Sequence, residues 1–412
     1  MKKRFFQIVI LLIFPIIMTW GFWTSPVAAL TEEQSLLGEA WRIVNLAYVD
    51  DSFNHQNWWF MRQNLIKKPL KNRQETYSAI QEMLGSLGDP FTRLLKPEEY
   101  RNLQVNTSGE LTGVGLQIAL DPQTGELTVI SPLNGSPAEA AGIQARDRIL
   151  QIDGLATTEF TLDEAANRMR GPVGSSVVLT ILRESSDQPQ DVKLIRDQIE
   201  INPVYAELKS NSETGPIGYI RLSQFNANAT AEIRQAVENF EQQGAIGYVL
   251  DLRNNPGGLL QSGVEIARLW LDEGTIVYTV NRQKVLGSFT ASGSAITNGP
   301  LVVLTNQGTA SASEILAGAL QDNNRALLVG EKTFGKGLIQ SLFDLSDGAG
   351  LAVTVAKYET PNHTDINQQG IVPDVVVEQE PISPNQITTE ADKQYQAAVE
   401  LLKSQVVVAN AA

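Results

Sequence analysis

Residues 330–337, GEKTFGKG, have types and spacing close to those of a phosphate-binding loop. Such a loop has Gly, four residues, and then Gly-Lys followed by Ser or Thr, whose hydroxyl binds Mg²⁺. Gly330, Gly335 and Lys336 stand at the required spacing, but Gly337 occupies the place of the hydroxyl. The residues that follow are typical of a strand and a turn, whereas the lysine of a P-loop opens a helix. We therefore expect Lys336 to serve a different chemistry.

A second group of reactive side chains lies at the predicted start of a helix. Thr309, Ser311 and Ser313 follow a predicted strand over residues 301–305. The first N–H groups of a helix are unpaired and carry partial positive charge, so a serine there has oxyanion donors beside it. The pattern Ser311-Ala-Ser-Glu314 is also a capping box, in which the serine only ends the helix. These residues alone leave both interpretations open.

A serine nucleophile needs a base, and the composition restricts the choice. The chain has no Cys and two His residues. Disulfides, thiol nucleophiles and zinc–thiolate or iron–sulfur sites are therefore excluded. A serine nucleophile could then be activated only by a carboxylate or by a neutral lysine, and a lysine kept neutral by desolvation activates serine in known Ser-Lys pairs. Lys336, between two glycines, is the candidate base. Lys332 is the rival and is expected to be solvated.

The elements that must position these residues alternate between strand and helix from about residue 215. Predicted strands at 249–253, 301–305 and 326–330 run into the loops that carry Asn254–Gly258, Ser311 and Lys336. The carboxyl ends of such strands share one edge of a sheet, where ligands bind. Neighbouring strands are about 4.8 Å apart. We expect the loops to meet there.

The N-terminal residues 1–29 have a basic start, a long uncharged apolar run and a small-residue end at Ala28-Ala29. This pattern predicts a secretory signal peptide cleaved near Ala29, with an uncleaved membrane anchor as the alternative. We expect the mature chain to be exported across a membrane. The formal net charge of −14 argues against nucleic-acid partners. The mature form should be soluble, and a membrane-peripheral position near its substrate stays open.

The predicted fold class is a multidomain α/β and α+β protein. We place a helical N-terminal domain at 30–108, which opens with a capping box at Thr31–Gln34. An α+β domain follows at 109–198, a mixed α/β core at 199–380 and a C-terminal helical segment at 381–412.

The α+β domain resembles a PDZ domain. The resemblance rests on Gly113-Val114-Gly115-Leu116, on SPA at 136–138, on AGI at 141–143 and on residues 149–154. Arg146 stands where the family usually has Gly. In such a domain, backbone N–H groups of the glycine loop capture the terminal carboxylate of a peptide, which pairs with a strand edge. A simple glycine hairpin is the alternative.

The chain as a whole closely resembles the carboxy-terminal processing peptidases, also called tail-specific proteases. Besides the PDZ unit, the match runs through LGDPFTRLL, GYIRLSQF, VLDLRNNPGG, NQGTASASEI, VGEKTFGKG, AVTVAKYETP and GIVPD. The resemblance implies that Ser311 is the nucleophile of a serine endopeptidase and that Lys336, 25 positions later, is its general base. It implies that Gln340 orients the lysine amine and that Glu314 is an acidic residue of the site.

The same resemblance implies that the N–H groups of Gly257 and Ala312 bind the oxyanion, and that Arg170 senses substrate at the end of the PDZ helix. Metals, nucleotides and other cofactors are not expected. His363 replaces a residue that is often Gly in the family, which leaves a less favoured idea of a histidine near Ser311.

Within the family, FNHQNWWFMR and RLSQFNANA make the chain similar to the photosynthetic members. These enzymes remove the C-terminal extension of the photosystem II D1 precursor. A protein substrate with a free C-terminal tail is therefore the expected partner. A non-catalytic exported PDZ adaptor that only binds C-termini is the alternative function.

Overall fold

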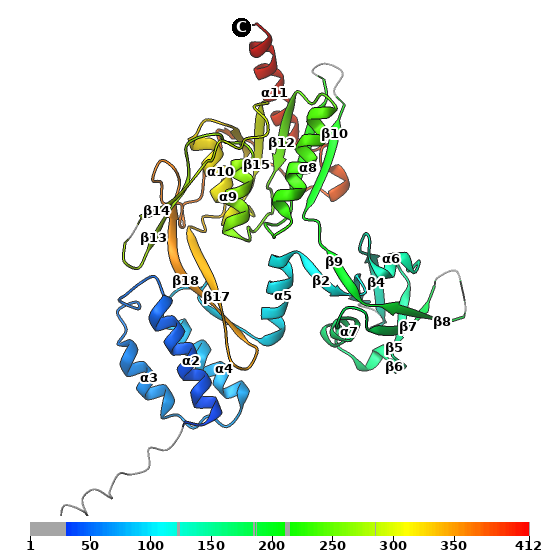
Figure 1. The fold of residues 1–412 in the computed structure, drawn as a ribbon, viewed down its shortest axis with the longest axis vertical. Helices are drawn as coiled ribbons and strands as arrows, with labels where there is room; N and C mark the ends of the chain where they lie inside the picture. Colours follow the sequence, from blue (N-terminus) through cyan, green and yellow to red (C-terminus); the bar gives the residue numbers. More distant parts are fainter. Residues whose placement is uncertain are drawn as a thin grey trace, which may run out of the picture. The chain divides into compact units, whose positions relative to one another are not determined.

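The computed structural model describes residues 30–411 except 122–123, 184–185, 187, 211–214 and 285. The predicted signal peptide lies outside the described residues. The chain divides into two compact units. One unit holds the chain up to Leu94 together with Leu342–Val353, and the other holds the rest. Figure 1 shows the elements in sequence colours.

The first unit is a bundle of α2 (Glu32–Ala47), α3 (Trp58–Ile66) and α4 (Arg73–Gly85). Helix α2 begins with the predicted capping box: the Gln34 N–H donates to Thr31 Oγ1 at 3.2 Å, and the Thr31 N–H donates to Gln34 Oε1 at 3.0 Å. Leu36 and Ile80 pack in one apolar cluster with Leu351, which arrives from much later in the chain. The apolar residues of 342–353 therefore complete a core that three helices alone would leave open.

The PDZ region belongs to the second unit and forms its own sheet in the order β3-β4-β5-β7-β8, with β3 at an edge. Its elements, with the preceding β1 and α5, are β1 (Arg93–Leu95), α5 (Pro97–Ser108), β2 (Glu110–Gly113), β3 (Leu116–Leu120), β4 (Leu127–Pro132), α6 (Pro137–Ala140), β5 (Arg148–Ile152), β6 (Leu155–Ala156), η1 (Thr157–Glu159), α7 (Leu162–Met169), β7 (Ser176–Leu182), β8 (Gln190–Ile195) and β9 (Asp197–Glu200). Strand β7 alternates buried and less buried residues, as one packed face requires. Val177, Leu179 and Ile181 supply the buried side.

The core has a six-stranded sheet in the order β10-β11-β12-β15-β16-β19, parallel except for β10. A second sheet has the order β1-β18-β13-β14, with β17 on β18. The elements are β10 (Val204–Lys209), β11 (Ile217–Leu222), α8 (Ala229–Gln242), β12 (Gly247–Asp251), α9 (Leu260–Arg268), β13 (Thr275–Asn281), β14 (Leu286–Thr290), β15 (Leu301–Thr305), α10 (Ala312–Asp322), β16 (Leu327–Gly330), β17 (Leu338–Asp344), β18 (Gly350–Glu359), β19 (Val375–Val376), η2 (Pro384–Gln386) and α11 (Lys393–Ala411). The alternation of strand and helix is as predicted.

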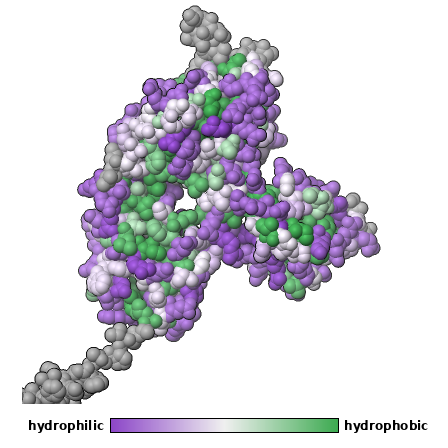
Figure 2. All heavy atoms as spheres, in the orientation of Figure 1, coloured by the Kyte–Doolittle hydropathy of each residue, from purple (hydrophilic) through white to green (hydrophobic). Residues whose placement is uncertain are grey.

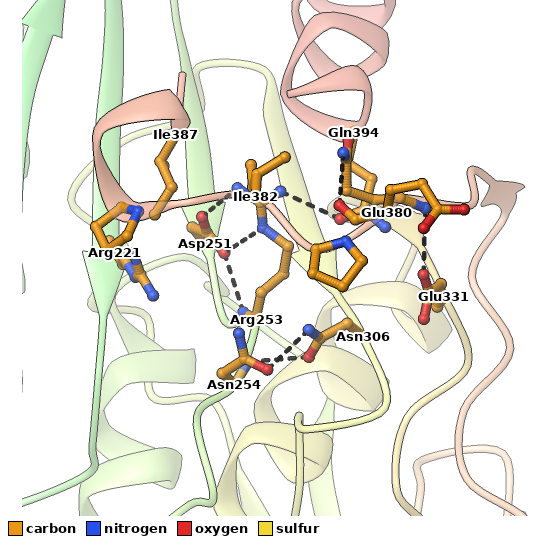
Figure 3. A pocket seen from close by; sticks show the side chains of 13 residues that line it. Arg221, Asp251, Arg253, Asn254, Asn306, Glu331, Glu380, Ile382, Ile387 and Gln394 are labelled. Carbon is orange, nitrogen blue, oxygen red and sulfur yellow. Dashed lines mark hydrogen bonds and ion pairs between the residues drawn. The ribbon is translucent and has the colours of Figure 1, made fainter. Parts of the chain in front are cut away.

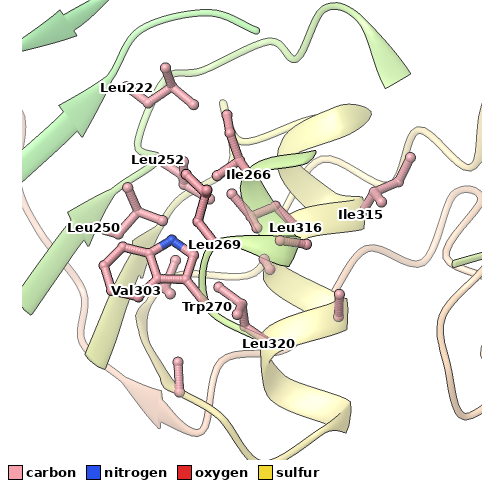
Figure 4. Close-up of a cluster of buried hydrophobic side chains, with 14 of the residues drawn as sticks. Leu222, Leu250, Leu252, Ile266, Leu269, Trp270, Val303, Ile315, Leu316 and Leu320 are labelled. Carbon is pink, nitrogen blue, oxygen red and sulfur yellow. The ribbon is translucent and has the colours of Figure 1, made fainter. Parts of the chain in front are cut away.

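Both faces of the four inner strands β11, β12, β15 and β16 are buried, so these strands are mostly apolar. Leu250 and Val303 point into the cluster formed with α8, α9 and α10, where Trp270 and Leu316 lie (Figure 4). Val249, next to Leu250 on β12, points to the opposite face of the sheet, towards Tyr395 of α11. Hydrophilic residues cover most of the surface seen in Figure 2. The predicted fold class, with a helical N-terminal part, a PDZ domain and a mixed α/β core, is confirmed.

Candidate active site

Ser311 occupies a strained turn between β15 and α10. Its φ of 59° and ψ of −118° lie outside the regions that L-residues prefer. Such strain persists only where surrounding contacts impose it, and it is concentrated at functional sites. The preceding residue is fixed because the Ala310 N–H donates to the Asn255 carbonyl at 3.0 Å. Ser311 is partly exposed, so its hydroxyl can reach a substrate at the helix start.

The neighbouring hydroxyls serve the scaffold. Thr309 and Ser313 are fully buried. Thr309 Oγ1 donates to the Leu252 carbonyl at 2.9 Å, and Ser313 Oγ donates to the Asn255 carbonyl at 3.0 Å. Both bonds attach the serine turn to the loop after β12. Of the three hydroxyls singled out in the sequence, Ser311 is the one that combines exposure with a strained backbone.

Glu314 is the organising carboxylate of the site. Its side chain is fully buried. Oε1 accepts from Thr333 Oγ1 at 2.6 Å and from the Gly335 N–H at 2.7 Å. Oε2 accepts from the Ser311 N–H at 2.8 Å and from the Lys336 N–H at 2.9 Å. A carboxylate has about four lone-pair positions, so its hydrogen-bonding capacity is filled. The backbones of the serine and of the lysine therefore share one acceptor atom.

Tyr358 of β18 makes a second link between these two backbones. Its hydroxyl lies 3.1 Å from the Ser311 carbonyl oxygen and also donates to the Lys336 carbonyl. Burial, and then the charge of Glu314, raise the pKa of Tyr358 well above its ordinary value. The hydroxyl therefore stays protonated and remains a donor. The sequence analysis did not single out Tyr358, although it lies in the segment AVTVAKYETP.

The loop that carries Lys336 is fixed at several backbone positions. The Phe334 N–H donates to the Thr309 carbonyl at 3.0 Å, and the Gly335 carbonyl accepts from the Gln368 N–H at 2.8 Å. A Cβ on Gly337 would lie 2.7 Å from the backbone nitrogen of Asn367, so only glycine fits there. Lys336 is half-buried and Lys332 is exposed, as the sequence predicted for the rival. The segment continues into strand β17, in agreement with the rejection of a P-loop.

Gly257 and Ala312 lie beside each other at the serine. A Cβ added to Gly257, whose φ is 96°, would lie 2.8 Å from Ser311 Cβ and 2.9 Å from the Ala312 nitrogen. Among the described residues, no acceptor hydrogen-bonds to the Ala312 N–H. The Gly257 N–H donates to Asn255 Oδ1 at 2.9 Å. Gly257 is therefore a close neighbour of the serine turn, and its N–H is engaged by Asn255.

Gln340 and His363 occupy different surroundings. Gln340 Nε2 lies 3.4 Å from Thr354 Oγ1, across the β17–β18 pair. The His363 ring stacks on Tyr278 with 4.2 Å between centroids, and its Nδ1 lies 3.0 Å from Glu359 Oε2. The imidazole is therefore engaged on the surface of the second sheet. The described contacts of the His363 ring lie with these two residues and none is with Ser311.

A buried ion cluster supports the loop after β12. Arg253 Nη2 lies 2.6 Å from Asp251 Oδ2 (Figure 3), and its Nη1 lies 2.7 Å from Asp392 Oδ1. Tyr219 donates to Asp251 at 2.7 Å. Burial alone lowers the pKa of Arg253, but the hydrogen bonds and charges of the two aspartates outweigh it and raise that pKa. The sequence analysis missed this cluster, for which the charged pair in VLDLRNNPGG was the available signal.

The cluster borders a pocket of about 390 Å³ at the carboxyl end of the sheet. Arg221, Ile382 and Ile387 line it, and the side chains of Asn254 and Asn306 meet across its floor at 3.0 Å (Figure 3). Ser311 and Lys336 are not among its lining residues. Asn306 and Glu331, from the loops that lead to Ser311 and Lys336, do line the pocket, whereas the two reactive residues themselves do not.

The PDZ domain has a small groove of its own, with a volume of about 60 Å³. Gly113, Val114, Gly115 and Leu116 line it from one side, and Arg170 lines it at the end of α7. The described residues offer no hydrogen-bond acceptor to the N–H groups of Val114 and Gly115. A Cβ on Gly115 would lie 2.3 Å from Ser136 Cβ, so this position requires glycine. The residues predicted to bind a carboxylate thus surround one groove beside the edge strand β3.

Arg170 brings positive charge to this groove. Its Nη1 lies 3.3 Å from Asn167 Oδ1. Burial, and then the nearby charge of Arg101, lower the pKa of Arg170. An anion in the groove would therefore relieve an unfavourable environment for the guanidinium.

Neither a metal centre nor a membrane span is found in the described part of the chain. No group of three or more His, Cys, Asp or Glu side chains there could hold a metal ion. The helices described between residues 30 and 411 include none that is long and apolar enough to cross a bilayer.

The fold and the site define a serine peptidase of family S41. The model of peptidase family S41 matches residues 216–377, and a PDZ-domain model matches residues 128–183. The chain is 62% identical to a carboxyl-terminal-processing protease of Synechocystis sp. over 94% of this chain and 91% of that protein. It is 47% identical to the chloroplastic carboxyl-terminal-processing peptidase 2 of Arabidopsis thaliana, with 85% and 70% covered.

Among solved structures, the photosystem II D1 C-terminal processing protease is 44% identical, with a TM-score of 0.55 over 84% of this chain and 94% of that one. The chain belongs to the carboxyl-terminal-processing proteases of peptidase family S41. The resemblance noted in the sequence is therefore confirmed, and the non-catalytic adaptor is not favoured.

Proposed function

We propose that the protein removes a C-terminal extension from a protein substrate with a Ser311–Lys336 dyad. The neutral amine of Lys336 takes the Ser311 proton while the serine oxygen attacks the scissile carbonyl. The ammonium then returns a proton to the leaving amine, and water resolves the acyl-enzyme. Gln340 orients the lysine amine. The N–H groups of Ala312 and Gly257 stabilise the oxyanion, with Gly257 released from Asn255.

One observation carries this proposal. Glu314 accepts hydrogen bonds from the backbone N–H groups of Ser311 and of Lys336 with a single carboxylate oxygen, at 2.8 and 2.9 Å. If Glu314 served only to cap the helix, it would not need to accept a hydrogen bond from Lys336, 22 positions later in the chain. The geometry therefore supports a unit of serine and lysine over a helix cap.

The PDZ groove is proposed to capture the substrate tail. The terminal carboxylate binds the N–H groups of Val114 and Gly115, within the Gly113–Leu116 segment, with the help of Arg170, and the peptide extends along β3. The relative of known structure is named for photosystem II D1. We propose the D1 precursor as the substrate of this chain as well, and action in the thylakoid lumen or periplasm after cleavage of the signal peptide near Ala29. A membrane-peripheral position beside this substrate belongs to the proposal.

The test is cleavage of a synthetic D1-type tail by the mature protein, followed by mass spectrometry of the new termini. Ser311→Ala and Lys336→Ala should each lower kcat by about 10⁴-fold or more, because a dyad fails when either member is removed. Lys332→Ala removes the exposed lysine of the same loop and should leave kcat within about twofold. Normal cleavage by either dyad variant would overturn the mechanism. Tail binding without any products in the unmodified protein would instead favour an adaptor.

A further inference from the structure

The charges of the N-terminal unit are distributed unevenly. Residues 52–74 contain no Asp or Glu but five Lys and Arg residues, in a chain whose formal charge is −14. Two of the five are neutralised locally: Lys68 lies 2.9 Å from Glu82, and Arg73 pairs with acidic neighbours that include Glu32. For Arg62, Lys67 and Lys71, the described residues provide no acidic partner within ion-pair distance. These three cations lie in a segment that has no acidic side chain of its own, within an acidic protein.

Helix α3, which carries Arg62 and is followed directly by Lys67, also exposes aromatic side chains. Trp59 and Phe60 of α3 are 61% and 60% exposed, whereas the adjacent Trp58 is 4% exposed. Helix α3 thus buries one aromatic residue in its bundle and presents the next two to solvent. Large apolar side chains exposed side by side mark an interaction site more often than single ones do.

The exposed tryptophan is held in position. The Trp59 ring packs edge-on against Trp41, with 6.0 Å between centroids. The Arg62 guanidinium lies 5.2 Å from the Trp41 ring centroid and 5.5 Å from that of Trp59. The cation and the aromatic ring are therefore presented together, which suits a surface where charge and apolar material are adjacent.

We propose that this surface, formed by Trp59, Phe60, Arg62, Lys67 and Lys71, docks the protein on an anionic lipid bilayer. Tryptophan and phenylalanine insert at the level of the headgroups, while lysine and arginine attract anionic lipids. We disfavour a second copy of the chain as the partner of this surface. The surface combines exposed aromatic side chains with cations that have no acidic partner, and this combination suits the boundary between water and an anionic lipid bilayer. The inference rests on the membrane-peripheral position proposed above and names the surface responsible. It does not require the peptidase mechanism.

The test is co-sedimentation of the protein with lipid vesicles. The processed protein is purified after export and verified by mass spectrometry. One set of vesicles contains phosphatidylcholine alone, and the other also contains about 30% phosphatidylglycerol, which gives its surface the negative potential of a natural anionic leaflet. We expect binding to the anionic vesicles only. The pair Lys67→Gln/Lys71→Gln should weaken it on the order of tenfold, because each cation near the surface contributes about 1 kcal/mol. Lys193→Gln/Lys393→Gln removes two exposed lysines elsewhere and should leave it within about twofold.

The aromatic part of the proposal has its own measurement. Lipids brominated near the headgroup should quench part of the tryptophan fluorescence, and Trp59→Ala should remove most of that quenching. Trp59→Ala/Phe60→Ala should weaken vesicle binding at least about tenfold while cleaving a soluble tail peptide at the normal rate. Unchanged binding by this pair, equal binding to both vesicle types, or concentration-dependent dimerisation that the pair abolishes would overturn the proposal. Loss of peptide cleavage with intact vesicle binding would count against the peptidase mechanism instead.

Discussion

At the scale of single residues, Glu314 is a buried carboxylate that joins the serine turn to the lysine loop. Its carboxylate fills four acceptor positions with donors from the serine turn and the lysine loop. Glu314→Gln keeps the shape but turns one acceptor atom into a donor. In one orientation the new NH₂ group faces the N–H groups of Ser311 and Lys336. In the other orientation it faces the Gly335 N–H and the Thr333 hydroxyl.

For Glu314→Gln we expect kcat to fall at least about 100-fold and the free energy of unfolding to fall by about 2–4 kcal/mol, since buried unsatisfied donors cost about 1–3 kcal/mol each. Peptide cleavage and urea unfolding measure the two effects. Glu273→Gln, at an exposed position, should change neither. Normal kcat in the Glu314→Gln variant would show that the shared carboxylate does not position the dyad.

Gly257 gives a second prediction at this scale. In Gly257→Ala, the new methyl group would lie 2.7 Å from the Ala310 carbonyl oxygen and 2.8 Å from Ser311 Cβ, so the serine turn must shift. We expect kcat to fall at least about tenfold, because a displaced oxyanion donor costs about 2.7–4 kcal/mol when it is lost completely.

The matched control is Gly293→Ala. Gly293 also has a positive φ, of 71°, but no atom lies within 4 Å of its added Cβ. It should lose only about 1 kcal/mol of stability, with kcat unchanged. If both variants lost kcat equally, the loss would follow from backbone strain in general and not from the serine turn.

The sequence was sufficient to predict the position of residues that directly follow the ends of strands. Ser311 and Lys336 come after adjacent parallel strands, so their approach was predictable from the alternation of strand and helix alone. Tyr358 was not, because its hydroxyl reaches the site from the second sheet, and no local pattern relates β18 to the serine turn. The bond from Gly257 to Asn255 was equally hidden, since it depends on a side-chain rotamer within a loop.

At the scale of elements, Asp392 fastens α11 to the central sheet. Its side chain accepts from the N–H of Tyr395 at 3.1 Å, which caps the helix start, and it pairs with Arg253 at the end of β12. Burial alone raises the pKa of Asp392, but Arg253 and the backbone N–H groups of Thr388 and Tyr395 outweigh it, so the net shift is downward. Helix α11 and the loop towards Gly257 are therefore attached to one guanidinium.

The lowered pKa fixes the sign of a pH effect. The stability contributed by ionised Asp392 is present above the unfolded pKa of about 3.9 and is lost as the pH falls through the lower folded value. At about pH 7, Asp392→Asn should lower the free energy of unfolding by about 3 kcal/mol. This is the low end for a broken buried ion pair, because Arg253 remains paired with Asp251.

Urea unfolding of Asp392→Asn and of the unmodified protein should therefore differ most near neutral pH, and the difference should shrink below about pH 4. Asp51→Asn, at an exposed position, is the control and should follow the unmodified protein throughout. A difference that stayed constant down to acid pH would mean that the loss comes from the changed hydrogen bonds of the amide, and not from the charge of Asp392, since Asn caps a helix as well as Asp does.

At the scale of the whole molecule, the compact units do not follow the order of the chain. Leu342–Val353, which covers the turn between two strands of the second sheet, belongs to the same unit as α2–α4. Periodicity predicted a helical N-terminal domain and a strand and turn after Lys336, but it contains no information on which distant segment completes an open apolar core. The domain boundaries proposed from the sequence remain predictions.

The PDZ domain and the protease core belong to one compact unit, and each carries a separate part of the proposed reaction. If the Gly113–Leu116 loop and Arg170 hold a terminal carboxylate, the charge of the tail should govern binding while chemistry at Ser311 proceeds unchanged. Amidation of the peptide's C-terminus removes that charge. We expect KM to rise by about 10–100-fold, since a charge-assisted hydrogen bond contributes about 1.5–3 kcal/mol, with kcat at saturation altered less than about twofold.

Fluorescence anisotropy with Ser311→Ala, which cannot turn over, should show the same loss of affinity for the amidated peptide. Arg170→Gln should reduce the preference for the free acid by several-fold, whereas Arg148→Gln, on a strand of the same domain but outside the groove, should preserve it. Equal affinity for acid and amide would place tail recognition outside this loop. A fall in kcat with unchanged affinity would instead assign the terminal charge a role in positioning the scissile bond.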